Sequence, residues 1–157
     1  MRSTFCRIAL GLWIVTIGVA GWSFVKGWTT QGTDGRIQIV LAPAERDLIL
    51  GEMRVLLKAV HGVVSGLAGQ DLEAARMQME QAARSAGMAM AADVNPALMA
   101  KLPLPFKQMG MSIHKDMDAL ADGILQKETP QQILQRLSSM TARCTTCHDM
   151  YRFGVGQ

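Results

Sequence analysis

The chain has 157 residues, of which 49% are apolar and 18% charged, so it is long enough for one domain and too hydrophobic for a disordered tail. The net charge is only +3, and lysines and arginines form no cluster with interleaved aromatic residues, which argues against nucleic-acid binding. Five of the eight aromatic residues lie in the first 28 residues. We therefore expect residues 1–28 and the rest of the chain to occupy different solvents.

The N-terminal segment is predicted to be a membrane anchor. Residues 8–25 are uncharged, and at about 1.5 Å per residue a helix of this length reaches about 27 Å, close to the thickness of the hydrocarbon layer. Arg2 and Arg7 precede this run and only Lys26 follows it, which predicts a cytoplasmic N-terminus and an external domain. In a bacterium this means a single-pass inner-membrane protein facing the periplasm. A cleaved secretory signal, whose apolar run is usually shorter, is the alternative.

Residues 29–42 are predicted to be a linker and lead-in. The run 29–35 is small, polar and glycine-rich, which is typical of a flexible tether. Residues 36–41 alternate briefly between polar and apolar side chains. Because we see no second strand for them to pair with, we expect them to pack on helices and not to form a sheet.

Residues 43–157 are predicted to form an all-α domain. Apolar residues recur at helical spacing from Pro43 to about Gly69, and Asp71 is a plausible N-cap for a second helix that reaches about residue 92. A third helix is expected over about 105–126. Thr129 opens a fourth, with a capping-box spacing and a proline at its first position. Four amphipathic helices with short connections favour an antiparallel four-helix bundle.

The fourth helix carries the motif that decides the chemistry, Cys144-Thr145-Thr146-Cys147-His148. On a helix its two cysteines and its histidine project from one face. This is the attachment pattern of c-type haem, with two thioethers and a histidine nitrogen on the iron. A zinc site would need further ligands, and only Cys6, His61 and His114 remain. A redox pair is also compatible with a lone CxxC, whereas a disulfide within a helical turn is sterically awkward. We therefore predict one covalently attached haem c.

The run from Cys144 to Arg152 resembles the cytochrome c-prime family, whose last helix carries CxxCHxxYR. The resemblance covers about residues 43–153. It implies that His148 is the proximal iron ligand and that Tyr151 and Arg152 lie close to the haem. Members of that family often form dimers through their first two helices, so a homodimer is a candidate assembly.

The resemblance also assigns the distal side of the haem to the first helix. Low-spin electron carriers of the family have methionine at the distal position, and five-coordinate gas-binding members have leucine. Counting back from Gly69, the matching residue is Met53, although an inward methionine can equally be a packing residue. The family often has an arginine one turn earlier, where this chain has Ile49, with Arg46 and Arg54 only nearby.

Two histidines and three further methionines are other candidate iron ligands. His61 and His114 are expected to be partly exposed or hydrogen-bonded, and not ligands. Met109, Met111 and Met117 are fallback sulfur ligands on the third helix.

The sequence therefore predicts a membrane-anchored periplasmic cytochrome that carries single electrons between periplasmic or membrane redox proteins, swinging on its tether. It shows no nucleophile motif, carboxylate pair with an evident cleft or phosphate loop, so we do not expect an enzyme. One alternative is a five-coordinate protein that binds NO or CO. Another is a haem-bearing accessory subunit of a membrane redox complex.

Overall fold

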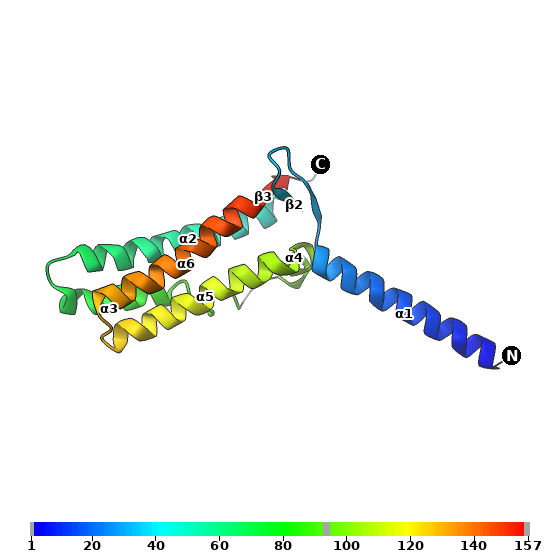
Figure 1. Cartoon of the computed structure of the whole chain (residues 1–157), viewed down its shortest axis with the longest axis horizontal. Helices are drawn as coiled ribbons and strands as arrows, with labels where there is room; N and C mark the ends of the chain where they lie inside the picture. The colour runs from blue at the N-terminus through cyan, green and yellow to red at the C-terminus, as the bar shows by residue number, and fades with distance from the viewer. Residues whose placement is uncertain (1, 93–94, 156–157) are drawn as a thin grey trace.

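The computed structural model describes residues 2–92 and 95–155, and in this part the chain is mostly helical with one small sheet (Figure 1). The helices are α1 (Arg2–Lys26), α2 (Pro43–Ala68), α3 (Leu72–Arg84), α4 (Pro96–Lys101), α5 (Leu104–Leu125) and α6 (Pro130–Met150). The strands are β1 (Thr29–Gln31), β2 (Ile37–Leu41) and β3 (Tyr151–Val155).

Helix α1 extends away from the rest of the molecule (Figure 1). Its segment Cys6–Lys26 has a mean hydropathy of 2.0 and none of it is buried in the protein. Its large apolar side chains face the surroundings: Leu12 is 65% exposed and Trp22 is 68% exposed. An exposed apolar surface of this size is typical of a contact with a membrane or another protein, and the helix is long and apolar enough to cross a membrane.

The predicted helix starts are confirmed by their caps. The Asp71 side chain accepts a hydrogen bond from the Ala74 backbone N–H at the start of α3. Thr129 and Gln132 form the predicted capping box at the start of α6. Each satisfies backbone donors that the first turn of a helix leaves without a partner. Helix α2 likewise begins at Pro43, as predicted.

The second predicted helix ends earlier than expected, at Arg84 and not near residue 92. The chain there turns around a carboxylate of α5, because the Met88 backbone N–H donates to Asp118 Oδ2 at 2.8 Å. A Cβ atom at Gly87 would collide with the same carboxylate. A short helix that was not predicted, α4, then follows, with Asn95 as its N-cap.

Four helices pack in succession, α2 on α3, α3 on α5 and α5 on α6, while the backbones of α2 and α6 approach one another less closely. Two apolar clusters fill the interior. The main core lies among these four helices and includes Val63, Met79, Met117, Leu120, Ile124, Ile133 and Met140. A second cluster, the sheet-end core, consists of Ile39, Leu41, Ile49, Leu98, Leu102, Phe106 and Tyr151.

The sheet corrects the expectation of an all-α domain without strands. Strand β2 pairs with β1 in antiparallel fashion and with β3 in parallel fashion, with Ile37 opposite Tyr151 and Ile39 opposite Phe153. Residues 36–41 therefore do find a partner strand, at the opposite end of the chain. Part of the run 29–35, predicted to be a flexible tether, forms β1 and the turn that returns to β2.

The domain also joins α1 directly. The Trp28 backbone N–H donates to the Lys101 carbonyl at 2.7 Å. Gly27 adopts a positive φ of 64°, and a Cβ atom there would collide with the backbone of residues 101–103. A residue with a side chain would be strained and crowded at this position. The end of α1 is thus seated against the segment between α4 and α5.

Two isoleucines of one strand test whether the sheet belongs to the core. Ile39 is fully buried and Ile37 is 36% exposed. We expect Ile39→Ala to lower the free energy of unfolding by about 2–5 kcal/mol, and the matched Ile37→Ala to change it by no more than about 0.5 kcal/mol. Urea unfolding of the full chain in detergent, followed by circular dichroism, measures both values. Equal effects of the two substitutions would contradict the burial of β2.

Candidate haem site

The CxxCH residues lie in the last two turns of α6. Both thiols are free, and both side chains are half-buried, whereas His148 is exposed. Cys144 packs against the main core, and Cys147 packs against the sheet-end core. The Tyr151 backbone N–H donates to the Cys147 carbonyl and ends the helix. The motif therefore contacts both apolar clusters through one face of a single helix.

The environment of the two thiols is apolar. Burial raises the pKa of the Cys144 thiol, and it raises the pKa of the Cys147 thiol to about 11. Both thiols are accordingly neutral near pH 7, whereas catalytic redox cysteines have lowered pKa values. In the described ranges, no three His, Cys, Asp or Glu side chains form a group that could hold a metal ion.

Met53 is brought to the same region as the motif. It lies half-buried on α2 and packs against the sheet-end core, as Cys147 does. Met99 and Met109 pack against this cluster too. Met109 is one of the fallback ligands predicted from the sequence, whereas Met99 is not, because nothing in the sequence predicted the short helix α4 that carries it. The structure therefore gathers three methionine side chains around the cluster that contacts Cys147.

The remaining candidate ligands lie elsewhere. His114 is 4% exposed, and its Nδ1 atom is 2.8 Å from the Ala86 carbonyl oxygen, so it is buried and hydrogen-bonded. His61 is exposed on α2. Met117 belongs to the main core, and Met111 lines a groove beside α1. None of these four side chains packs against the sheet-end core in the described part of the chain.

Tyr151 is buried in the sheet-end core and begins β3. Its ring meets the Phe106 ring edge to face, with centroids 5.4 Å apart, and Phe153 meets Phe106 in the same way at 5.8 Å. Aromatic rings favour this arrangement because the positive edge of one ring faces the negative face of another. Tyr151 thus belongs to the cluster against which Cys147 packs, and its contact with a haem stays a prediction.

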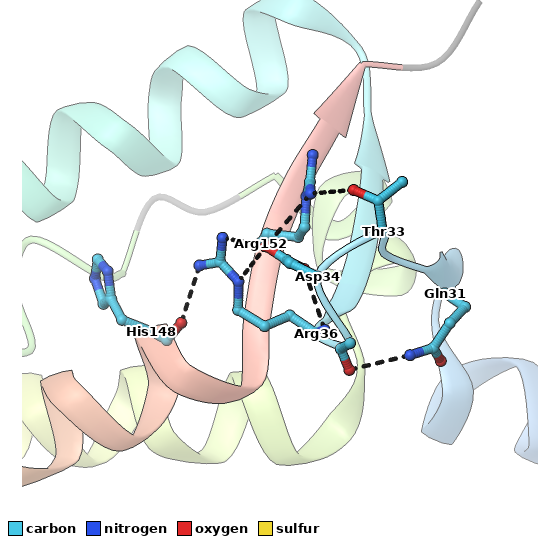
Figure 2. Close-up of polar contacts among 7 residues, drawn as sticks. Gln31, Thr33, Asp34, Arg36, His148 and Arg152 are labelled. Carbon is cyan, nitrogen blue, oxygen red and sulfur yellow. Dashed lines mark hydrogen bonds and ion pairs between the residues drawn. The ribbon is translucent and has the colours of Figure 1, made fainter.

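Arg152 points into a polar network at the turn between β1 and β2 (Figure 2). Its Nη1 atom donates to Thr33 Oγ1 at 3.2 Å and lies 3.4 Å from Asp34 Oδ2. Arg36 donates to the same carboxylate at 2.6 Å and to the His148 carbonyl at 3.1 Å. Figure 2 shows the His148 imidazole extending away from this network.

Sequence reasoning missed Arg36, although it holds the backbone of the proposed iron ligand. Its Nη1 atom donates to the carbonyl of His148 itself, in the last turn of a helix, where carbonyl oxygens lack intrahelical partners. No local signal could have identified this contact, because Arg36 and His148 are far apart in the sequence.

Arg46 supplies a free donor on the face of α2 that carries Met53. Its Nε atom is buried and has no hydrogen-bond partner in the described part of the chain, while its Nη2 atom donates to Asp47 Oδ1 at 3.4 Å. Arg46 precedes Met53 by two helical turns, so both residues lie on one side of the helix. Two thiols, an imidazole, a thioether and a guanidinium with an unpartnered Nε atom fit a covalent haem with carboxylate side chains.

The Asp34 carboxyl group provides a test of the network in Figure 2. The Arg36 guanidinium that donates to it lowers its pKa from 3.8 to about 2. A carboxyl group with a lowered pKa stabilises the folded protein fully when the pH is above its ordinary pKa. This stabilisation is lost as the pH falls through the lowered pKa of the folded state. We expect NMR titration of Asp34 to show a midpoint near pH 2. Arg36→Gln should raise this midpoint toward 3.8, and the control Arg54→Gln should leave it unchanged. An unaltered midpoint in Arg36→Gln would refute the contact.

Comparison with known proteins adds no relative: no family model, curated protein or solved structure matches the chain. The resemblance to the cytochrome c-prime family therefore remains a prediction from residues 144–152 and the helix pattern, and the function is argued from the side chains themselves.

Proposed function

We propose that the protein is a membrane-anchored c-type cytochrome with one covalent haem, which carries single electrons between redox proteins of the membrane or periplasm. The observation that carries this proposal is the CxxCH motif on α6, with its two free thiols half-buried against the interior and Cys147 on the same apolar cluster as Met53. In this proposal α2, α3, α5 and α6 form a four-helix bundle around the site.

Cys144, Cys147 and His148 are the residues that would hold the haem. Each of Cys144 and Cys147 would add its S–H bond across one vinyl group, so that the sulfur and the hydrogen end on the two vinyl carbons. His148 would give an imidazole nitrogen lone pair to the iron. Arg36 supports this role because its hydrogen bond holds the His148 carbonyl. A bound haem supplies a one-electron iron couple.

Met53 would also hold the iron, through its thioether sulfur. A haem iron with a thioether and a histidine ligand would favour the reduced state and have a raised reduction potential. Met53 would also occupy the position that an exogenous gas would need. The exposed state of His148 and the packed state of Met53 mean that side chains must rearrange when the group binds. Met53, Met99 and Met109 suit this because methionine is unbranched and adapts its shape.

Arg46 and the sheet-end core would determine the charge environment of the haem. The unpartnered Arg46 Nε atom is available to donate to a propionate carboxylate, and a charge-assisted bond of this kind is stronger than a neutral one. Ile49, Phe106 and Tyr151 would exclude water from the site, which further favours the less charged state of the group.

The anchor gives the location. With Arg2 and Arg7 inside, α1 would leave the domain on the periplasmic side, where c-type haem is attached in bacteria. The hydrogen bond from Trp28 to Lys101 and the pairing of β1 with β2 argue against the swinging tether expected from composition. We propose instead that the domain stays at a fixed height above the membrane and that mobile redox partners come to it.

The visible spectrum tests this proposal. Full-length protein produced with cytochrome c maturation is expected to show sharp low-spin bands when reduced, and carbon monoxide should leave them unaltered because Met53 occupies the sixth position. Met53→Ala should open that position, so that the reduced spectrum becomes high-spin and shifts with carbon monoxide. Met77→Ala, which removes a methionine that is 67% exposed, is the matched control and should behave as the wild type.

Two results would change the assignment. A wild-type protein that is already high-spin and responds to carbon monoxide would be five-coordinate, and a gas-binding role would replace electron transfer. A Met53→Ala protein that keeps the low-spin spectrum would exclude Met53 as the ligand.

A further inference from the structure

A groove of about 350 Å³ lies where the end of α1 meets α5. Its apolar walls come from Phe24 of α1, Met99 of α4, and Leu104 and Met111 of α5, and Lys107 and Lys115 also line it. It borders the candidate haem site through Met99, but neither Cys147 nor Met53 lines it.

Lys107 is a buried cation where α1, α4 and α5 meet. The residue is 7% exposed, and its Nζ atom donates to the carbonyl oxygens of Phe24 and Met99, each at 3.2 Å. The same atom lies 3.6 Å from the centroid of the Phe24 ring. Among the described residues, no Asp or Glu forms an ion pair with it. An ammonium group has three donors, and these two carbonyls use two of them.

The Phe24 carbonyl belongs to the last turn of α1, where the helix dipole supplies about half a negative charge. This offsets the Lys107 ammonium only in part. Burial also lowers the pKa of Lys107, because loss of solvent disfavours its charged form.

Lys101, at the same junction, provides the contrast. Its Nζ atom is 2.6 Å from Glu45 Oε1 and 4.7 Å from the centroid of the Trp28 ring. In the described part of the chain, a carboxylate thus pairs with Lys101 and none pairs with Lys107. Burying a charge without an opposite partner costs free energy, so an anion from outside the protein would be strongly favoured at the groove.

The position of the groove indicates the source of that anion. Phe24 lies at the end of the apolar segment Cys6–Lys26, so a membrane crossed by α1 would have its headgroup layer at this level. This step rests on the membrane anchor of the proposed function. The groove offers cations for a phosphate and apolar walls for the adjoining hydrocarbon.

We propose that this groove binds an anionic phospholipid, with Lys107 and Lys115 at the phosphate and with Phe24, Leu104 and Met111 along the acyl chain. A bound lipid would complete the contact between anchor and domain and would hold the domain against the membrane.

Native mass spectrometry of the full chain in detergent tests the proposal, with phosphatidylglycerol and phosphatidylcholine of equal chain length as probes. The wild type is expected to retain phosphatidylglycerol preferentially. Lys107→Met should reduce this preference by about fivefold, since a lysine near a lipid surface contributes about that factor. Lys101→Met is the matched control, because Glu45 already pairs with Lys101, and it should keep the preference.

Lys115→Gln is a second test that does not depend on the folding of Lys107→Met. Because Lys115 is exposed, its substitution should reduce the preference for phosphatidylglycerol without disturbing the contact between α1 and α5. Equal retention of the two lipids by the wild type, with haem present, would overturn the lipid site and leave the cytochrome assignment intact. Displacement of phosphatidylglycerol by an equal concentration of inorganic phosphate would identify a free-phosphate site and overturn the lipid. A chain that enters no bilayer would overturn the anchor and the lipid site together.

Discussion

The parallel pairing of β2 with β3 is the constraint on which the arrangement of the site depends. Helix α6 ends at Met150 and β3 begins at the next residue, so strand pairing holds the last turn of the motif helix. Strand β2 ends at Leu41, just before α2 begins at Pro43. One ladder of backbone hydrogen bonds therefore ties the end of the helix that carries Cys147 to the start of the helix that carries Met53, and both side chains pack against the cluster between them.

The two apolar clusters of the interior differ in how their side chains pack. The main core consists of fully buried side chains of four helices, such as Val63, Leu120 and Ile133, and tight packing of this kind resists change. The sheet-end core is bordered by partly buried methionines, whose flexible side chains suit a region that must accept a cofactor. At the outer edge, Arg36 and Asp34 join the β1–β2 turn to the carbonyl of His148.

Features encoded by neighbouring residues could be predicted from the sequence, and features that depend on distant residues could not. The caps at Asp71 and Thr129 are local, and so is the CxxCH motif. The β2–β3 pairing was missed because its strands lie at opposite ends of the chain, where a six-residue run gives no sign of its partner. The early end of α3 depends on Asp118, which reaches the turn from another helix. The cation at Lys107 likewise becomes notable only when burial removes its solvent. The inward position of Met53 follows from helical spacing along α2, whereas its role as an iron ligand comes from the resemblance and stays a prediction.

The central claim is that Cys144 and Cys147 carry a haem, and intact mass under denaturing conditions tests it most directly. Full-length protein produced with cytochrome c maturation should have the mass of the polypeptide plus one haem, and Cys6→Ser should retain that added mass. Cys144→Ser together with Cys147→Ser should have the mass of the polypeptide alone. A wild-type chain without the added mass, or one that keeps it when both motif cysteines are replaced, would contradict the assignment.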